Sequence, residues 1–195
     1  MLKKMIYAVA VLAFTVTLAL PQGKGGGKGA PKGPGMALSS PDFQDGGIIP
    51  DKFTQNDPNV VAVSPRLEWT NVPDGTQSFV LIMHDPDNAL GGGTDDVLHW
   101  IMFNIPGTAR SLAGGLPLDA QLPDGTIQAK GIRNVGYMGP GNAAINPYHH
   151  YTLELYALNA KLTLGPDATR ADVMKAMDTH TVGKAVLVGR FKRTS

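Results

Sequence analysis

The chain has no cysteine among its 195 residues and few aromatic ones, with two tryptophans, five tyrosines and six phenylalanines. The absence of cysteine excludes disulfide bonds, thiolate metal sites and lipid attachment through a cysteine side chain. Acidic residues are absent before Asp42, whereas five lysines lie before residue 36. Subtracting these five charges from the formal net charge of +1 leaves −4 on the rest of the chain. That balance argues against a nucleic-acid-binding face, so no nucleic-acid partner is expected.

The first 35 residues have the composition of a targeting segment followed by a linker. Lys3 and Lys4 precede an apolar run from Met5 to Leu20, which is the layout of a secretory signal. This run has 16 residues, fewer than the ~20 that span a bilayer, so a signal peptide over 1–20 is favoured over the alternative of an N-terminal anchor. Residues 21–35 are rich in Gly, Lys and Pro and predict a solvated linker.

We therefore expect a periplasmic or secreted protein whose folded domain covers residues 36–195. The basic linker is either a plain spacer or a peripheral contact with an anionic surface.

The remaining 160 residues predict one mostly β domain. Apolar runs alternate with Pro-Asp-Gly and Gly-rich turns, a rhythm typical of a mostly antiparallel β sandwich. One short helix is expected towards the C-terminus, from Thr169 as N-cap to Met177, with Val173, Met174 and Met177 as its apolar stripe. The expected strands are 60–63, 79–83, 97–105, 127–130, 151–158 and 185–191.

Polar side chains suited to binding or catalysis gather in three patches at or near the ends of these runs. The patches are Asp85-Pro86-Asp87, His99-Trp100, and the stretch from Gly139-Pro140-Gly141 to His149-His150-Tyr151. Strands can bring such patches together in one pocket. Taken singly, each patch also has an ordinary interpretation, because Asp-Pro-Asp is a common surface turn and a lone histidine in an apolar strand is usually a satisfied core residue.

The last patch combines a strand with a glycine loop. The two-residue period of a strand puts His149 and Tyr151 on one face and His150 on the other. Gly139 and Gly141 leave backbone N–H groups unobstructed, so their loop can receive an anion.

Signatures of common hydrolases are absent from the sequence. No serine lies in a Gly-x-Ser-x-Gly elbow, and there is no His-Glu-x-x-His helix. A metal-dependent hydrolase using His99, His149 and an acid stays an alternative, since two imidazoles and a carboxylate can hold zinc. The main prediction is a protein that is not an enzyme and needs no metal or cofactor.

Ordered motifs extend over nearly the whole domain. They are 47–54, 64–69, Asp85-Pro86-Asp87, His99-Trp100, 104–106, 131–134, His149-His150-Tyr151 and 187–191. Together they resemble the phosphatidylethanolamine-binding protein family, and more closely its bacterial branch of Raf-kinase-inhibitor-like proteins. Two departures concern the site: Asn142-Ala143-Ala144 stands where the family usually has a Pro-Pro pair, and Gln55 stands where it often has cysteine.

The resemblance implies a β sandwich with a small preformed pocket for phosphate esters, phospholipid headgroups or similar anions. Together with the signal-like N-terminus, it implies an exported binding protein, with modulation of a partner protein as an open addition. The alternative is a protease or kinase inhibitor acting through a surface loop such as 109–124. Within the pocket, Asp87 is the residue we expect to face an ammonium group. Carried over by position, the ligand-binding residues are Asp85, Asp87, His99, Gly139, Pro140, Gly141, His149 and Tyr151.

Overall fold

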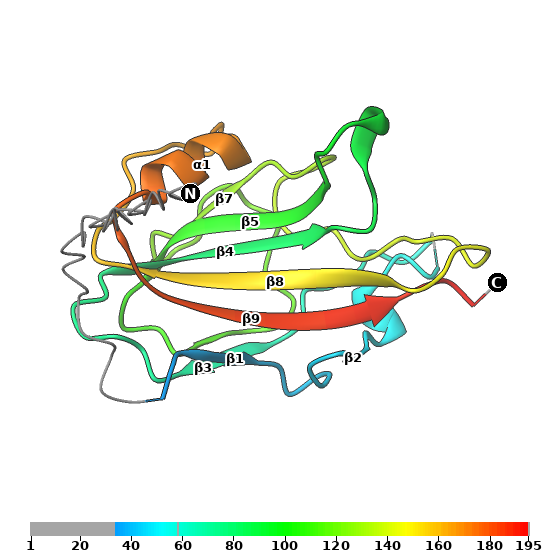
Figure 1. The fold of residues 1–195 in the computed structure, drawn as a ribbon, viewed down its shortest axis with the longest axis horizontal. Coiled ribbons are helices and arrows are strands. Elements are labelled where there is room, and N and C mark those ends of the chain that lie inside the picture. Colours follow the sequence, from blue (N-terminus) through cyan, green and yellow to red (C-terminus); the bar gives the residue numbers. More distant parts are fainter. Residues whose placement is uncertain (1–33, 58, 195) are drawn as a thin grey trace, which may run out of the picture. The chain divides into compact units, whose positions relative to one another are not determined.

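Two β-sheets form the fold in the computed structural model, which describes residues 34–57 and 59–194 (Figure 1). The larger sheet has the strand order β2-β9-β8-β4-β5-β7, and the smaller has the order β1-β3-β6. Among the strands of these described residues, only the pairing of β2 with β9 is parallel. The predicted mostly antiparallel β sandwich with one short helix is therefore confirmed, whereas the signal-peptide prediction and most of the linker lie outside the described residues.

The bounds of the elements follow the order of the chain. They are β1 (Ala37–Ser39), β2 (Gly47–Ile48), the 3-10 turn η1 (Asp51–Phe53), β3 (Leu67–Thr70), β4 (Ser78–Asp85), η2 (Leu90–Gly92), β5 (Val97–Pro106), β6 (Ser111–Leu112), β7 (Ile127–Ala129), β8 (His149–Leu158), α1 (Arg170–Met177) and β9 (Thr181–Phe191).

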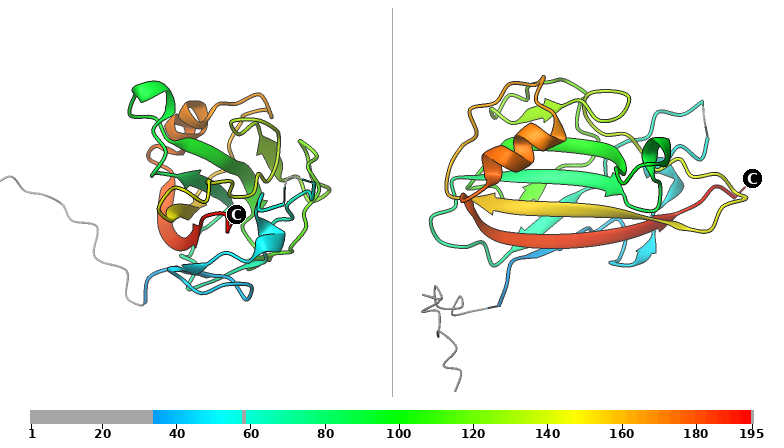
Figure 2. Two further views of the ribbon diagram at one scale, coloured as in Figure 1. Left: turned by 90° about the vertical axis from the view of Figure 1, so that its right-hand side faces the viewer. Right: turned by 45° about the horizontal axis from the view of Figure 1, so that its top comes forward.

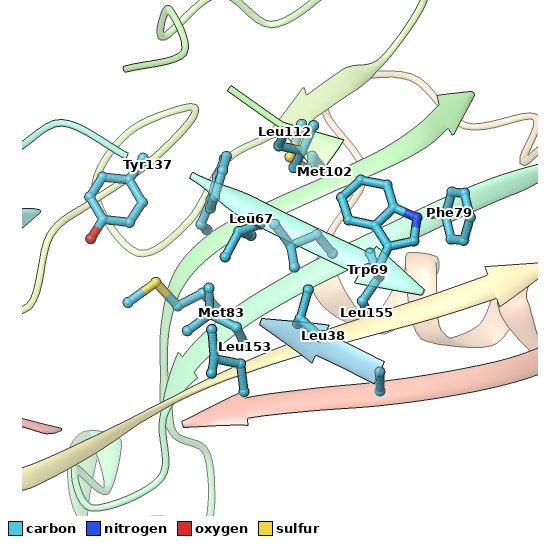
Figure 3. Packing of buried hydrophobic residues seen from close by; sticks show 14 of the residues in the cluster. Leu38, Leu67, Trp69, Phe79, Met83, Met102, Leu112, Tyr137, Leu153 and Leu155 are labelled. Atoms are coloured by element: carbon cyan, nitrogen blue, oxygen red, sulfur yellow. The ribbon is translucent and has the colours of Figure 1, made fainter. Parts of the chain in front are cut away.

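The central strands β4, β5 and β8 are apolar on both faces because both faces of the larger sheet are covered. On one face, side chains such as Met83 and Leu155 pack in one cluster with Trp69 and other residues of the smaller sheet (Figure 3). On the other face, side chains such as Ile82 pack against Val173 of α1. The right-hand view of Figure 2 shows helix α1 lying over β4 and β5. Complete burial of these residues supplies most of the driving force for folding.

Helix α1 begins where the sequence predicts. Thr169 and Asp172 form a capping box, in which each side chain accepts a hydrogen bond from the other residue's backbone N–H. Val173 and Met177 are buried, but Met174 is 42% exposed. The prediction for Met174 was wrong because so short a helix presents only a narrow line of side chains to the sheet, and Met174 lies beside that line.

Two other predictions differ from the structure. The run 60–63 forms no strand. Val60 N–H donates to the carbonyl of Asp57 in a local turn, and Val63 N–H donates to that of Lys52 in the preceding 3-10 turn η1, so neither group is available to a sheet ladder. The short strands β1, β2, β3 and β6 were not predicted, because two to four residues carry too little alternation to be recognised.

Several loops meet at one end of the larger sheet, on the right in Figure 1, where β4 and β9 end and β5 and β8 begin. The antiparallel order brings these strand ends together although they are far apart in sequence. The three polar patches lie at this end.

Candidate functional site

A cavity of about 490 Å³ lies at this end of the sheet, and five of the eight predicted site residues line it. The five are Asp85, His99, Gly141, His149 and Tyr151. Asp87, Gly139 and Pro140 are not in its wall. The structure therefore brings together residues 66 positions apart in the chain, and separates the two acids of the Asp-Pro-Asp motif.

Asp85 is the one acidic residue in the wall of this cavity, and it is buried. Its Oδ1 accepts a hydrogen bond from the backbone N–H of Asp87 at 3.0 Å, and its Oδ2 lies 2.8 Å from Nδ1 of His149. Because a carboxylate only accepts, Nδ1 of His149 carries the hydrogen of this contact. The second ring nitrogen, Nε2, is then the atom of His149 that can meet a ligand.

His99 reaches the cavity through a β-bulge. Met83 pairs with Trp100 and His84 pairs with Leu98, so His99 has no partner on β4. Strict alternation would place His99 and Trp100 on opposite faces, but a bulge can turn an extra side chain towards the same side. Its ring packs edge-on against that of Tyr151, with the centroids 5.1 Å apart.

The electrostatics of the cavity keep His99 neutral and Tyr151 protonated. Burial lowers the pKa of His99 below its ordinary value, although the carbonyl of Met138 and the charge of Asp85 oppose this, and nearby Arg133 lowers it further. Nδ1–H of His99 donates to the Met138 carbonyl at 2.9 Å, which leaves Nε2 as an acceptor. Burial and the Asp85 charge raise the pKa of Tyr151 well above its usual range, so its hydroxyl stays a donor.

Asp87 lies outside the cavity wall and binds His150 instead of His149. Its Oδ2 accepts from the backbone N–H of His150 at 2.6 Å and lies 2.8 Å from Nδ1 of the same residue. Burial alone would raise the pKa of Asp87, but these contacts with His150 outweigh it and lower the pKa overall. The outward orientation of His150 agrees with the strand period, and an ammonium group inside the cavity would meet Asp85 instead of Asp87.

Gly139 and Pro140 belong to the packing behind the cavity wall. A Cβ at position 139 would lie 2.6 Å from Cβ of Ala62 and 2.7 Å from the carbonyl oxygen of Phe53, so only glycine fits there. The side chain of Gln55 donates to the carbonyl of Gly139 at 2.6 Å, and its backbone N–H donates to that of Pro140 at 2.7 Å. Gln55, which departs from the family pattern, thus fastens the loop.

Two arginines in the wall were missing from the predicted site. Arg133 and Arg193 both line the cavity. Within 34–57 and 59–194, neither guanidinium lies within 4 Å of a carboxylate oxygen. Arg133 lies in the family-like motif 131–134, so the sequence contained a signal that could have identified it as a site residue. Arg193 had none, because its place depends on the pairing of β9 with the start of β8, where Phe191 lies opposite His149.

Among the described residues, no group of three or more His, Cys, Asp or Glu side chains is placed to hold a metal ion. No described helix is long and apolar enough to cross a membrane.

Comparison with known proteins identifies the family. The family model described as phosphatidylethanolamine-binding protein matches residues 39–192. A UPF0098 protein of Methanothermobacter thermautotrophicus is 37% identical over 81% of this chain and 99% of its own length. LppC of Mycobacterium tuberculosis, named as a lipoprotein, is 36% identical over 84% of this chain and 75% of its own length.

Solved structures agree with the sequence comparisons. The homolog CT736 from Chlamydia trachomatis is 29% identical, with a TM-score of 0.69, over 82% of this chain and 98% of that one. Escherichia coli YbcL has the same fold, with a TM-score of 0.68 at 24% identity over 80% of this chain and 98% of that one. The match of the family model over most of the chain shows that this protein belongs to the phosphatidylethanolamine-binding protein family.

Proposed function

We propose that this protein is an exported binding protein, not an enzyme, whose cavity takes a small phosphate ester, a phospholipid headgroup or a similar oxyanion. One observation carries the proposal. Arg133, Arg193 and the Tyr151 hydroxyl line the same cavity, while its one acidic residue, Asp85, is already bound by His149. Two cations against one carboxylate make the cavity attractive to an anion.

The donors and acceptors also indicate the protonation state of the ligand. The guanidinium groups and the phenol donate hydrogen bonds, and oxyanion oxygens accept them. Nε2 of His99 can accept one, because this ring is neutral and its Nδ1–H is engaged by the carbonyl of Met138. An oxyanion that keeps one O–H group satisfies both sets, so we expect a singly protonated phosphate or phosphate monoester to match the cavity best.

Export is supported by composition and by one relative. We propose that residues 1–20 are a signal peptide or anchor, that residues 21–35 are a linker, and that the folded domain begins at 36. A relative named as a lipoprotein, LppC, supports a place in the cell envelope or outside the cell. This chain has no cysteine, so it cannot itself be anchored through a lipid on a cysteine side chain.

We favour the cavity over the segment 109–124 as the functional element. That segment contains strand β6, and the side chain of Gln128 donates to the carbonyls of Pro117 and Asp119 at 2.8 Å each. Backbone N–H of Leu116 donates to Oγ of Ser64 at 3.0 Å. These contacts hold the segment in place, and pre-organised loops of this kind also occur in protease inhibitors. Our preference for the cavity therefore rests on the polar groups that it gathers.

Calorimetric titration of the full chain with inorganic phosphate and phosphoethanolamine, with EDTA throughout, tests the proposal. Saturable binding is expected, and Arg133→Ala is expected to weaken it about tenfold because one charged hydrogen-bond donor is lost. Lys130→Ala is the matched control, since Lys130 is exposed three residues away and lies outside the cavity wall. Absence of binding, or equal weakening in both variants, would contradict the proposal.

A further inference from the structure

A second cavity, also of about 490 Å³, shares part of its wall with the first. Four residues line both cavities, and they are Gln55, Arg133, Met138 and Arg193. The two arginines therefore lie at the junction of the cavities. An anion held by both arginines has a polar cavity on one side and the second cavity on the other.

The second cavity differs from the first in the character of its remaining wall. Val60, Val61, Ala62 and Leu118 line it, and imidazoles are absent from it. Val60 is 55% exposed and Val61 is 77% exposed. Single exposed apolar side chains are ordinary, but several around one cavity leave a patch of apolar surface whose burial by a ligand is favourable.

Gln55 forms the partition between the two cavities. Its amide group lies within 3.2–3.4 Å of the place where Gly141, in the first cavity wall, would carry a Cβ. The same side chain donates to the carbonyl of Gly139, in the second cavity wall. An amide side chain is a small barrier, so a ligand bound at the arginines can extend past it.

Charge gives the direction in which such a ligand must lie. Asp57 lines the second cavity on the side of the valines, and its Oδ1 accepts hydrogen bonds from the backbone and side chain of Asn59. Each cavity has one carboxylate in its wall, but Asp85 of the first is hydrogen-bonded to His149, whereas the recorded partner of Asp57 is the neutral Asn59. An anion held at Arg133 and Arg193 is therefore repelled more strongly from the second cavity than from the first. The charged end of a ligand is thus kept out of the second cavity, and its apolar part is kept in.

We propose that Val60, Val61 and Leu118 form an apolar subsite for the ester group of the same anion whose oxygens bind the polar cavity. The ligand class is a soluble phosphate monoester that carries one short aliphatic group. This inference rests on the proposed function, because the arginines must first hold the anion. It adds a specificity element that lies in the segment 59–63, outside every polar patch of the sequence.

Titration of the full chain with inorganic phosphate, ethyl phosphate, butyl phosphate and hexyl phosphate tests the subsite. Each methylene that enters the subsite is expected to tighten binding about two- to fourfold, from the free energy of burying a CH₂ group. In the variant Val60→Ser/Val61→Ser this dependence on chain length should be lost, while affinity for inorganic phosphate stays unchanged. Val63→Ser is the control, since Val63 is also exposed, at 43%, but does not line the cavity.

The outcomes separate the two proposals. If no phosphate binds, the proposed function fails. If inorganic phosphate binds but butyl and hexyl phosphate bind no tighter, or if the dependence on chain length survives in the double variant, the subsite is refuted while the anion cavity stands. Vesicles of phosphatidylethanolamine, added as a competitor, identify the source of the ester. Displacement of hexyl phosphate by vesicles would overturn the assignment to a soluble monoester, and failure to displace it would support that assignment.

Discussion

Two histidine–aspartate pairs lie side by side at the end of the sheet, and they differ in burial rather than in distance. Nδ1 lies 2.8 Å from the carboxylate in both the Asp85–His149 and the Asp87–His150 pair. The side chains of the first pair are 3% and 12% exposed, whereas those of the second are 40% and 49% exposed. An ion pair in water is weak, but a buried carboxylate that loses its partners is costly. Distance alone would thus assign the same role to both pairs. We call the Asp85–His149 pair the buried wall and the Asp87–His150 pair the exposed rim.

The largest expected effect is a difference between Asp85 and Asp87 in how much each side chain stabilises the fold. Asp85→Ala should lower the free energy of unfolding by about 3 kcal/mol, because the buried ring of His149 and the N–H of Asp87 both lose an acceptor. Asp87→Ala should lower it by less than about 1 kcal/mol, since water can replace the carboxylate at the rim. Urea unfolding of both variants at neutral pH measures the difference.

Circular dichroism would confirm that both variants keep the secondary structure of the wild type before unfolding. Losses of equal size in the two variants would show that burial does not distinguish the pairs.

A second prediction concerns His99, which is buried without a carboxylate partner and so extends the comparison to a third imidazole. Its pKa in the folded protein is lowered from the ordinary value of 6.5, chiefly by burial. Below pH 6.5 the unfolded chain therefore binds a proton that the folded chain resists. The stability that neutral His99 contributes is complete above pH 6.5 and decreases as the pH falls below it.

Urea unfolding at about pH 7.5 and about pH 5.5 tests this expectation. The wild type should lose more stability between these values than His99→Gln, whose amide can still donate to the Met138 carbonyl but does not titrate. The Asp85–His149 pair is present in both proteins, so its own pH dependence cancels in the comparison. A His99→Gln protein with the same pH dependence as the wild type would refute the assignment.

The buried wall was easier to predict from the sequence than the rim. His149 and Tyr151 follow from strand alternation, which a sequence shows directly. Asp85 came from the Asp-Pro-Asp motif and the family resemblance, because every residue of β4 except His84 is buried and the strand shows no alternation. His99 also came from the family resemblance, because a β-bulge, which breaks the period, is what turns it inwards.

Features that depend on contacts between distant loops were not predictable in this way. The role of Gln55 as a fastener, the packing of Gly139 against Ala62, and the position of Arg193 at the cavity all require knowledge of which loops meet. The exposed valines at 60 and 61 were misread as a strand, since apolar character alone does not tell a buried run from an exposed cavity wall. Sequence reasoning thus located the polar cavity but missed its neighbour.

The smallest expected effect isolates the rim pair itself. The contacts with His150 lower the pKa of Asp87 despite some burial, so ionised Asp87 stabilises the fold at neutral pH, and this contribution is lost as the pH falls through the carboxyl range. Because both side chains are largely in water, a double-mutant cycle of Asp87→Asn and His150→Gln should give a coupling of about 0.5 kcal/mol or less. Added salt screens exposed charges, so at about 1 M NaCl the coupling should vanish, whereas the cost of Asp85→Ala should persist. A rim coupling that resisted salt would mean that His150 and Asp87 are shielded as effectively as the buried pair, and the difference between wall and rim would not hold.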